Sequence, residues 1–598
     1  MPSPRRRGRR LLRYSPWLQK SAALVREDMM VTYARDVQKW IWASPILGII
    51  TGLLVTGIAA IILDWLWPAV RGFDLAYPAA IVPTVTLGFI VAGLIMQYGT
   101  PDPNEHSTVE VIRAYHERGG KISMRPFIQK LTAAIATVGL GGSAALEGPG
   151  IYSGGALGSW LWTHLRRFGM EPKDRRILVI SGAAAGMSAV FRAPLTGIMF
   201  ALEMPFKDDL AHEAVLPSLI ASVVSYATMS AFMGSEPLFD FPAAGAFTGR
   251  DLAWSALLGA GCGLVAMAFT ITFRRFRHYS IHARIPHWCK MGIGGALTGL
   301  CGLAFVSWYH SGLIPLGPNY EAADLILRQS HGSAELVVFA VLKMLATMFS
   351  LGVGGVSSMF VPLFLTGGSL GTAFAQSIVH STTPELFAAV GMASFIAAGY
   401  KTPLTAVIFV AEATGGHAFI IPSLIGAAVA YGVSGEASAS TDQRVHQTAR
   451  IAELAALKAS DAMRQHVTTV QAGATMEEFS QLLNPHQIHT VYPVLEDTRV
   501  IGTIALQTLS AVPQAMWKVR VVRDLTLTDI PRLTPDATLQ EALQLLTARR
   551  DRHLVLVVNT DETLAGILTT TDILKGLEAF GQQVPPARDP VPAPDPAG

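Results

Sequence analysis

Long apolar segments recur through the first three quarters of this chain, and they constrain its fold more than any other feature. Residues 46–65 and 79–96 form two of them, close to the length of about 20 residues that a helix needs to cross a bilayer. Only 15% of the 598 residues are charged, against about 25% in soluble domains. These patterns predict an α-helical protein that crosses a membrane several times.

Two motifs occur twice in the apolar part of the chain. The pattern P-x-x-x-[S/T]-G-G-x-L-G begins at Pro149 and again at Pro362, 213 positions later. A second pattern, P-L-T-x-x-x-F, begins at Pro194 and again at Pro403, 209 positions later. Two collinear matches at nearly one offset predict a duplicated membrane unit.

Charge indicates how the two copies are oriented. The membrane part spans about 43–445, with repeats at about 43–233 and 250–435, and residues 1–42 form a basic segment expected in the cytoplasm. The basic run 274–278 should face the cytoplasm as well, whereas the stretch that joins the repeats carries little positive charge. The second copy would then start on the opposite side, which makes the repeat inverted. Inverted repeats commonly hold a substrate near the midplane at interrupted helices.

Glu147 is the residue most suggestive of chemistry. It lies in the glycine-rich, apolar stretch 141–149, and an acid inside a membrane segment is a functional hypothesis by default. Backbone N–H groups at a helix start form an anion site, which a glutamate side chain can itself occupy. Protonation would release it and open the path. The matching box at 352–362 offers a second helix start, and two such helix ends indicate an anion rather than a cation.

The composition becomes that of a soluble protein beyond residue 445. A linker helix is expected at 446–460, followed by a paired α/β region at 461–577 and a proline-rich, disordered tail at 578–598. Capping boxes at Thr475/Glu478 and Thr538/Glu541 predict two helices, each followed by two short strands. The predicted strands are 490–495, 500–504, 554–558 and 564–568.

The membrane boxes resemble the CLC family of chloride channels and proton-coupled chloride antiporters. Glu147-Gly-Pro is similar to the family's G-(K/R)-E-G-P motif, and Ser358-Met-Phe-Val-Pro to its G-x-F-x-P motif. The boxes at Pro194 and Pro403 match its P-L-(T/A)-G-x-x-F-x-x-E stretches. The resemblance implies a homodimer with one pore per subunit and gating by Glu147. It also implies anion binding by backbone N–H groups at Leu146, Gly148, Met359, Phe360 and Val361.

The sequence departs from the family pattern at several places. Its serine motif aligns with Ser107 and Thr108, without the usual glycines and proline. The basic residue before the gating glutamate is Leu146. The pore tyrosine expected near 438–443 is missing and Ser440 is the aligned residue, which would leave the central anion site less well closed on its intracellular side.

Two positions bear on proton coupling. A second glutamate of many antiporters is replaced here by Met204, whereas the preceding Glu203 has a counterpart in Glu412 and is expected to be structural. The loss of this second glutamate weakens the case for proton coupling. Water could still carry protons past Met204 to Glu147.

The paired C-terminal region resembles tandem cystathionine-β-synthase-type (CBS) domains. Nucleotide-binding copies often end in G-h-x-(S/T)-x-x-D, and the second copy has this motif, with Thr569 and Asp572 as the polar residues. The first copy lacks both polar groups. The resemblance therefore implies at most one adenine-nucleotide site, and a purely structural pair is the alternative.

The function expected from the sequence is transport of chloride or a similar anion, with protons as a possible second substrate. A passive anion channel and a fluoride exporter are close alternatives, and a CBS-coupled divalent-cation channel or a membrane sensor would be different classes. We find no pattern typical of an enzyme, a metal site or a nucleic-acid-binding protein, and no cofactor is required by the sequence. The expected location is a bacterial or archaeal inner membrane, as a multi-pass protein with both termini cytoplasmic.

Overall fold

A computed structural model describes residues 16–236, 238–239, 247–327, 331–414, 419–440, 442–444, 457–465, 467–483, 490–547, 554–573 and 575–576. The chain divides into two compact units, Met1–Gln447 and Thr448–Gly598, and each is described by itself. The predicted proline-rich tail and most of the predicted linker helix lie outside the described residues.

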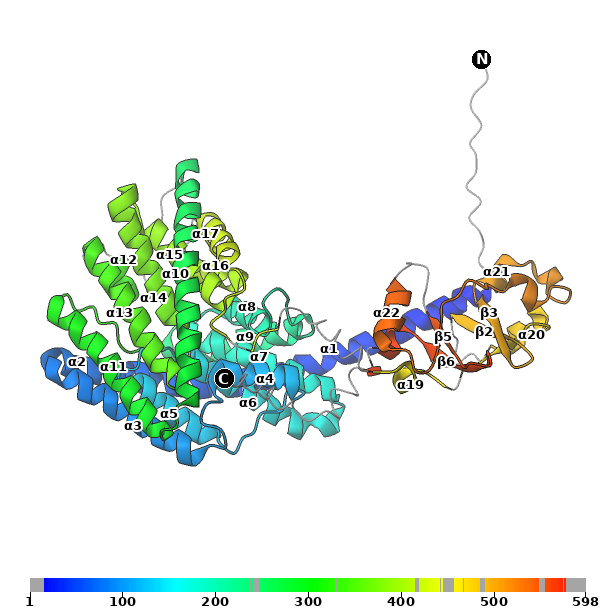
Figure 1. Ribbon diagram of the computed structural model, residues 1–598, viewed down its shortest axis with the longest axis horizontal. Coiled ribbons are helices and arrows are strands. Elements are labelled where there is room, and N and C mark those ends of the chain that lie inside the picture. Colours follow the sequence, from blue (N-terminus) through cyan, green and yellow to red (C-terminus); the bar gives the residue numbers. More distant parts are fainter. Residues whose placement is uncertain are drawn as a thin grey trace, which may run out of the picture. The chain divides into compact units, whose positions relative to one another are not determined.

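The first unit consists of helices, drawn from blue to yellow in Figure 1. Those of the first repeat are α1 (Pro16–Ala59), α2 (Trp67–Ala76), α3 (Ile81–Gly99), α4 (Ser107–Glu117), α5 (Phe127–Gly139), α6 (Glu147–Leu165), α7 (Pro172–Phe191), α8 (Pro194–Glu203) and α9 (Val215–Met233). Those of the second are α10 (Gly249–His282), α11 (His287–Trp308), α12 (Glu321–Leu327), α13 (Ser333–Gly352), α14 (Phe360–Phe374), α15 (Pro384–Tyr400), α16 (Pro403–Thr414) and α17 (Ile420–Val433).

Six helical segments of this unit, among the residues described, are long and apolar enough to cross a membrane. They are Gln38–Ala76, Pro78–Gly99, His212–Met233, Gly249–His282, His287–Trp308 and Ser333–Gly352. The prediction of a multi-span helical protein is confirmed. Residues 16–42 of the predicted basic segment 1–42 are part of α1. Residues 17–44 contain no glycine or proline, so nothing in the local sequence interrupts the helix.

The duplicated glycines allow close packing of helix pairs in both repeats. A Cβ atom on Gly154 of α6 would lie 1.8 Å from the Gly182 carbonyl oxygen of α7, and one on Gly367 of α14 would lie 2.2 Å from that of Gly391 in α15. Only glycine permits such an approach. The same repeated motif therefore joins equivalent helix pairs in the two halves.

The second unit contains two three-stranded sheets of the same design. In the first, β1 (Val470–Gln471) pairs in parallel with β2 (Val491–Glu496), which pairs antiparallel with β3 (Arg499–Ala505). In the second, β4 (Arg532–Leu533), β5 (Val555–Val558) and β6 (Leu564–Leu568) repeat this order. The short helices are α19 (Ala459–Ala462), α20 (Met476–Gln481), α21 (Thr508–Ala511) and α22 (Leu539–Thr547).

Both predicted capping boxes are confirmed. The Thr475 N–H donates to Glu478 at 2.8 Å, and the Thr538 N–H donates to Glu541 at 3.2 Å. Each box opens the helix that covers its sheet, α20 or α22, because the paired side chains satisfy two backbone donors at the helix start.

Candidate functional site

Glu147 lies where the two repeats meet. It is the first residue of α6 and is fully buried. One carboxylate oxygen accepts a hydrogen bond from Ser358 Oγ and a second, of 2.7 Å, from the backbone N–H of Phe360, the first residue of α14. A carboxylate from the first repeat therefore occupies the N-terminus of a helix in the second. The free N–H groups and the dipole of a helix favour negative charge at this end.

The backbone segments before α6 and α14 lie side by side. The Ala145 N–H donates to the Ser358 carbonyl at 3.0 Å, and a Cβ atom on Gly148 would lie 2.7 Å from the Ser357 carbonyl carbon. Glycine at position 148 is thus required by the close approach of the other repeat. These segments bring together the residues predicted to bind an anion through backbone N–H groups, Leu146, Gly148, Met359, Phe360 and Val361.

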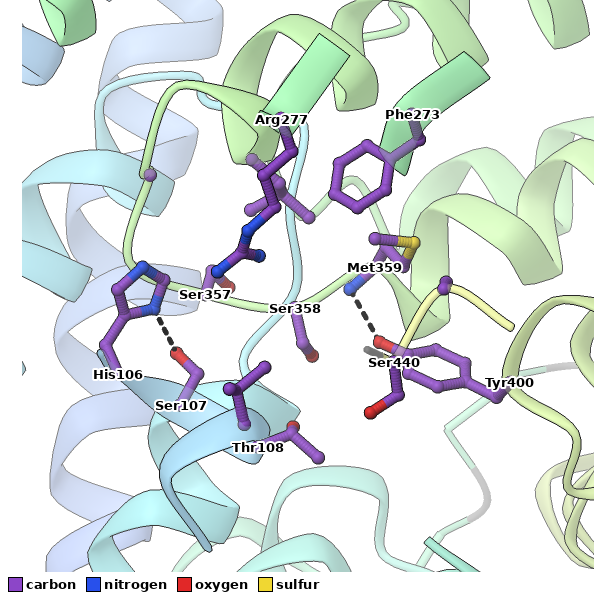
Figure 2. A pocket seen from close by; sticks show the side chains of 14 residues that line it. His106, Ser107, Thr108, Phe273, Arg277, Ser357, Ser358, Met359, Tyr400 and Ser440 are labelled. Atoms are coloured by element: carbon purple, nitrogen blue, oxygen red, sulfur yellow. Dashed lines mark hydrogen bonds between the residues drawn. The ribbon is translucent and has the colours of Figure 1, made fainter. Parts of the chain in front are cut away.

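Ser358 and Met359 line a cavity of about 40 Å³. Three further predicted residues line it, Ser107, Thr108 and Ser440, and Figure 2 shows their side chains around it. Glu147 does not line this cavity, but Ser358 lines it and also binds the Glu147 carboxylate. The cavity and the site held by Glu147 are therefore adjacent, with Ser358 between them.

Hydroxyl groups in the cavity wall are available as hydrogen-bond donors. Thr108 Oγ1 and Ser440 Oγ are buried and have no hydrogen-bond partner among the described residues. Ser107 Oγ lies 3.2 Å from His106 Nδ1. A buried hydroxyl without a partner is costly, and an acceptor placed in the cavity would satisfy these groups. Such an arrangement suits an anion, which accepts hydrogen bonds from hydroxyl and backbone N–H groups alike.

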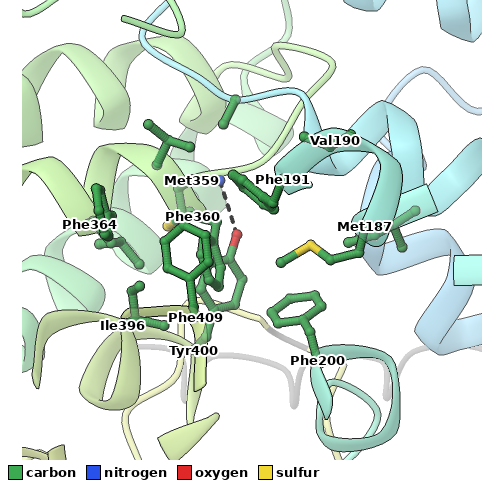
Figure 3. Close-up of a cluster of buried hydrophobic side chains, with 14 of the residues drawn as sticks. Met187, Val190, Phe191, Phe200, Met359, Phe360, Phe364, Ile396, Tyr400 and Phe409 are labelled. Atoms are coloured by element: carbon green, nitrogen blue, oxygen red, sulfur yellow. Dashed lines mark hydrogen bonds between the residues drawn. The ribbon is translucent and has the colours of Figure 1, made fainter. Parts of the chain in front are cut away.

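Tyr400 also belongs to this site, and the sequence reasoning missed it. Its hydroxyl accepts a hydrogen bond of 3.0 Å from the Met359 N–H and lines the cavity. Figure 3 shows its ring beside those of Phe200 and Phe360, whose centroids lie 5.7 and 6.1 Å away. The expected tyrosine position was near 438–443, whereas Tyr400 ends α15. The sequence predicts no pore tyrosine at this site, because residues 438–443 contain none. The structure places the hydroxyl of Tyr400 there, from a different helix.

Glu203 and Glu412 form a reciprocal contact between the repeats. Glu203 ends α8 and accepts hydrogen bonds from the N–H groups of Leu404 and Thr405 at the start of α16, at 3.1 and 2.8 Å. Glu412, in α16, accepts from the N–H groups of Leu195 and Thr196 at the start of α8, at 3.0 and 2.8 Å. Each glutamate caps the partner helix, as its predicted structural role requires. Met204, which follows Glu203, is buried.

The residues proposed for nucleotide binding already contact each other. One Asp572 oxygen accepts hydrogen bonds from the Thr569 N–H and hydroxyl, at 3.1 and 2.6 Å. The other oxygen pairs with Arg464 Nε at 2.6 Å. A nucleotide at this motif would have to exchange some of these contacts.

The fold and site define a class of protein. Duplicated, interrupted helices surround a cavity lined by hydrogen-bond donors, an architecture typical of membrane transport proteins. Comparison with known families is more specific. The family model described as "voltage gated chloride channel" matches residues 87–435, and the CBS domain model matches 459–512 and 522–579. The chain belongs to the voltage gated chloride channel family and carries two CBS domains.

Several known proteins are similar to this chain. An H(+)/Cl(-) exchange transporter ClcA from Yersinia pestis (bv. Antiqua, strain Angola) is 27% identical over 400 residues, covering 64% of this chain and 81% of the relative. The putative chloride channel protein ClcB-like from Ralstonia nicotianae is 24% identical over 358 residues, covering 59% and 81%.

Two solved structures share the fold. A CLC-type fluoride/proton antiporter is 22% identical and covers 68% of this chain and 98% of its own, with a TM-score of 0.58. A eukaryotic CLC transporter is 15% identical and covers 90% of this chain and 98% of its own, with a TM-score of 0.55.

Proposed function

We propose that this protein transports chloride or a similar small anion across a membrane, with Glu147 as the gate. The observation that carries the proposal is the Glu147 carboxylate at the N-terminus of α14, bound to Ser358 Oγ and the Phe360 N–H. These donors hold a negative group in the position where a diffusible anion can replace it. The names of relatives such as the Yersinia H(+)/Cl(-) exchange transporter support chloride as the substrate.

The gating step follows from the charge of Glu147. Protonation removes the negative charge that the helix end favours, and the side chain then leaves Ser358 and Phe360. An anion that reaches the cavity binds to the hydroxyls of Thr108, Ser440 and Tyr400 and moves on to the vacated donors. Return of the ionised side chain displaces the anion, so that each opening admits a limited number of ions.

Proton antiport is the mode we favour, because the same carboxylate that blocks the path also carries a proton. A passive channel is the second candidate, and it is favoured by Met204, which cannot exchange protons at the position of the family's second glutamate. The glutamate gate does not separate chloride from fluoride, and the fold neighbours include a CLC-type fluoride/proton antiporter.

The remaining proposals concern assembly and regulation. From the family resemblance, the protein forms a homodimer with one pore per subunit in a prokaryotic inner membrane, with both termini cytoplasmic. The CBS pair regulates transport, and an adenine nucleotide binds at Thr569 and Asp572 in its second copy. Nucleotide binding there requires that Asp572 give up part of its contact with Arg464.

The test is anion flux with simultaneous pH recording in liposomes that contain the purified protein. We expect chloride efflux with coupled proton movement from the wild type, and chloride efflux without proton movement from Glu147→Gln. Glu436→Gln, which alters a side chain that is 87% exposed, is the matched control and should behave as the wild type. Chloride efflux without proton movement in the wild type would assign a channel. Absence of chloride, nitrate and fluoride flux would refute the transport proposal.

A further inference from the structure

Arg277 brings a positive charge to the cavity from a helix that does not belong to the duplicated boxes. It lies near the end of α10, where Arg274 and Arg275 are exposed and Arg277 is half-buried. Arg277 lines the cavity together with Ser107, Thr108 and Ser440. Figure 2 shows its guanidinium group pointing into the space between the α4 start and the Ser357–Met359 segment.

This guanidinium lacks a carboxylate partner in the part of the chain that the structure describes. No ion pair or hydrogen bond joins it to a described residue. Asp442 and Asp102 attract it only at longer range, and Asp442 is paired with Arg113 Nε at 3.0 Å. A charge removed from water without a partner is costly. The cavity therefore presents a positive charge for which none of the described residues supplies a paired negative group.

The neutral groups in the same wall complete the site. Thr108 Oγ1 and Ser440 Oγ have no partner among the described residues, and Tyr400, whose Oη accepts from the Met359 N–H, lines the same cavity. The hydroxyls and the guanidinium therefore present donors to one cavity of about 40 Å³. This volume suits a single small anion.

We propose that Arg277 supplies the fixed positive charge of an inner anion-binding site in this cavity and sets its affinity for chloride-like anions. The inference rests on the proposed transport function. The motif that precedes Glu147 has Leu146 where the family pattern has a basic residue. Arg277, near the end of α10, places a positive charge in the cavity. The same cavity is lined by Ser358, whose hydroxyl binds the Glu147 carboxylate. An anion bound there is positioned to replace the Glu147 carboxylate when the gate opens.

The experiment measures chloride binding by isothermal titration calorimetry with the full-length purified protein, and chloride efflux from liposomes with the same variants. Arg277→Gln should weaken chloride binding at least about tenfold and raise the chloride concentration for half-maximal efflux by a similar factor. Arg277→Lys keeps the positive charge, so its chloride affinity should fall less than that of Arg277→Gln. Arg275→Gln removes an exposed charge two residues away and is the matched control, with binding within about twofold of the wild type.

A cysteine variant tests the charge at position 277 in case Arg277→Gln does not fold. If Arg277→Gln does not fold, Arg277→Cys is treated with a positively or a negatively charged thiosulfonate reagent, and identically treated wild type controls for the native cysteines. Restoration of binding by the positive reagent alone supports the site. Unchanged chloride affinity in folded Arg277→Gln, or equal affinity after both reagents, refutes the role of Arg277 while the transport function stands. Failure of the wild type both to bind and to transport chloride refutes the proposed function itself.

Discussion

Replacement of Glu203 by glutamine tests whether this buried acid is structural or takes part in proton transfer. The carboxylate of Glu203 is 5% exposed and accepts from the Thr405 N–H, the Thr405 hydroxyl and the Leu404 N–H. Glutamine has one oxygen and one NH₂ group in place of two oxygens. If the oxygen keeps both Thr405 contacts, the NH₂ group faces the Leu404 N–H, and two donors oppose each other.

The lost contacts determine how much Glu203→Gln destabilises the protein. An unsatisfied buried donor costs about 1–3 kcal/mol, and loss of negative charge at a helix N-terminus costs about 0.3–1 kcal/mol more. We therefore expect Glu203→Gln to lower the free energy of unfolding by about 1–4 kcal/mol. Glu412→Gln changes the equivalent contacts to Leu195 and Thr196, but Glu412 is only half-buried. Water can replace the lost contact there, so Glu412→Gln should lower the free energy of unfolding by only about 1–2 kcal/mol.

The assay is thermal unfolding of the purified variants in detergent, combined with the liposome measurement of protons moved per chloride ion. We expect a lower unfolding temperature for both variants, the larger decrease for Glu203→Gln, and an unchanged proton-to-chloride ratio in the protein that remains folded. Glu436→Gln serves again as the surface control. Wild-type stability of Glu203→Gln together with a loss of proton movement would refute the structural role and make Glu203 a proton carrier.

Three further predictions concern packing, the cavity and the CBS pair. Gly154→Ala should prevent correct folding, because the new Cβ would lie 1.8 Å from a carbonyl oxygen, whereas Gly57→Ala, with nothing within 4 Å, should express and elute from size exclusion as the wild type does. Tyr400→Phe removes one hydroxyl donor and should weaken chloride binding about tenfold by calorimetry without loss of folding; unchanged affinity would exclude Tyr400 from the anion path. Asp572→Ala should destabilise the second CBS copy by about 1–3 kcal/mol, because the contacts with Arg464 and the Thr569 N–H are lost. It should also abolish any rise in unfolding temperature caused by ATP. A rise that survives the substitution would place the nucleotide elsewhere.

The sequence predicted those parts of the site that depend on local pattern. Glycine and proline at the starts of α6 and α14 mark where helices begin, so the position of Glu147 at a helix start could be read directly. The recurrence of both motifs then indicated that two such helix ends come together. Strand β6 was predicted at its observed bounds, because β-branched and apolar residues between turns carry a local signal.

The rest of the site depends on tertiary contacts that leave no local signal. Tyr400 ends a helix whose remaining residues are apolar and buried, and nothing in its immediate sequence distinguishes it from a packing residue. Arg277 belongs to a basic run that reads as a topological marker. Whether a basic residue in such a run points to solvent or into a cavity depends on the helices packed against it, which the sequence of the run does not contain.

The reciprocal contact of Glu203 and Glu412 has a consequence for biosynthesis. The N–H groups at the start of α8 are synthesised more than 200 residues before Glu412, their acceptor. Glu203 likewise cannot form its contact until Thr405, about 200 residues later in the chain, has been synthesised. Until Thr405 is made, the Glu203 carboxylate, which is 5% exposed in the folded protein, needs water or lipid headgroups to satisfy it, and the bilayer interior provides neither. The first half should therefore remain near the insertion machinery or a lipid-headgroup region until the second half emerges, and a nascent chain truncated before α16 should be a substrate for membrane quality control.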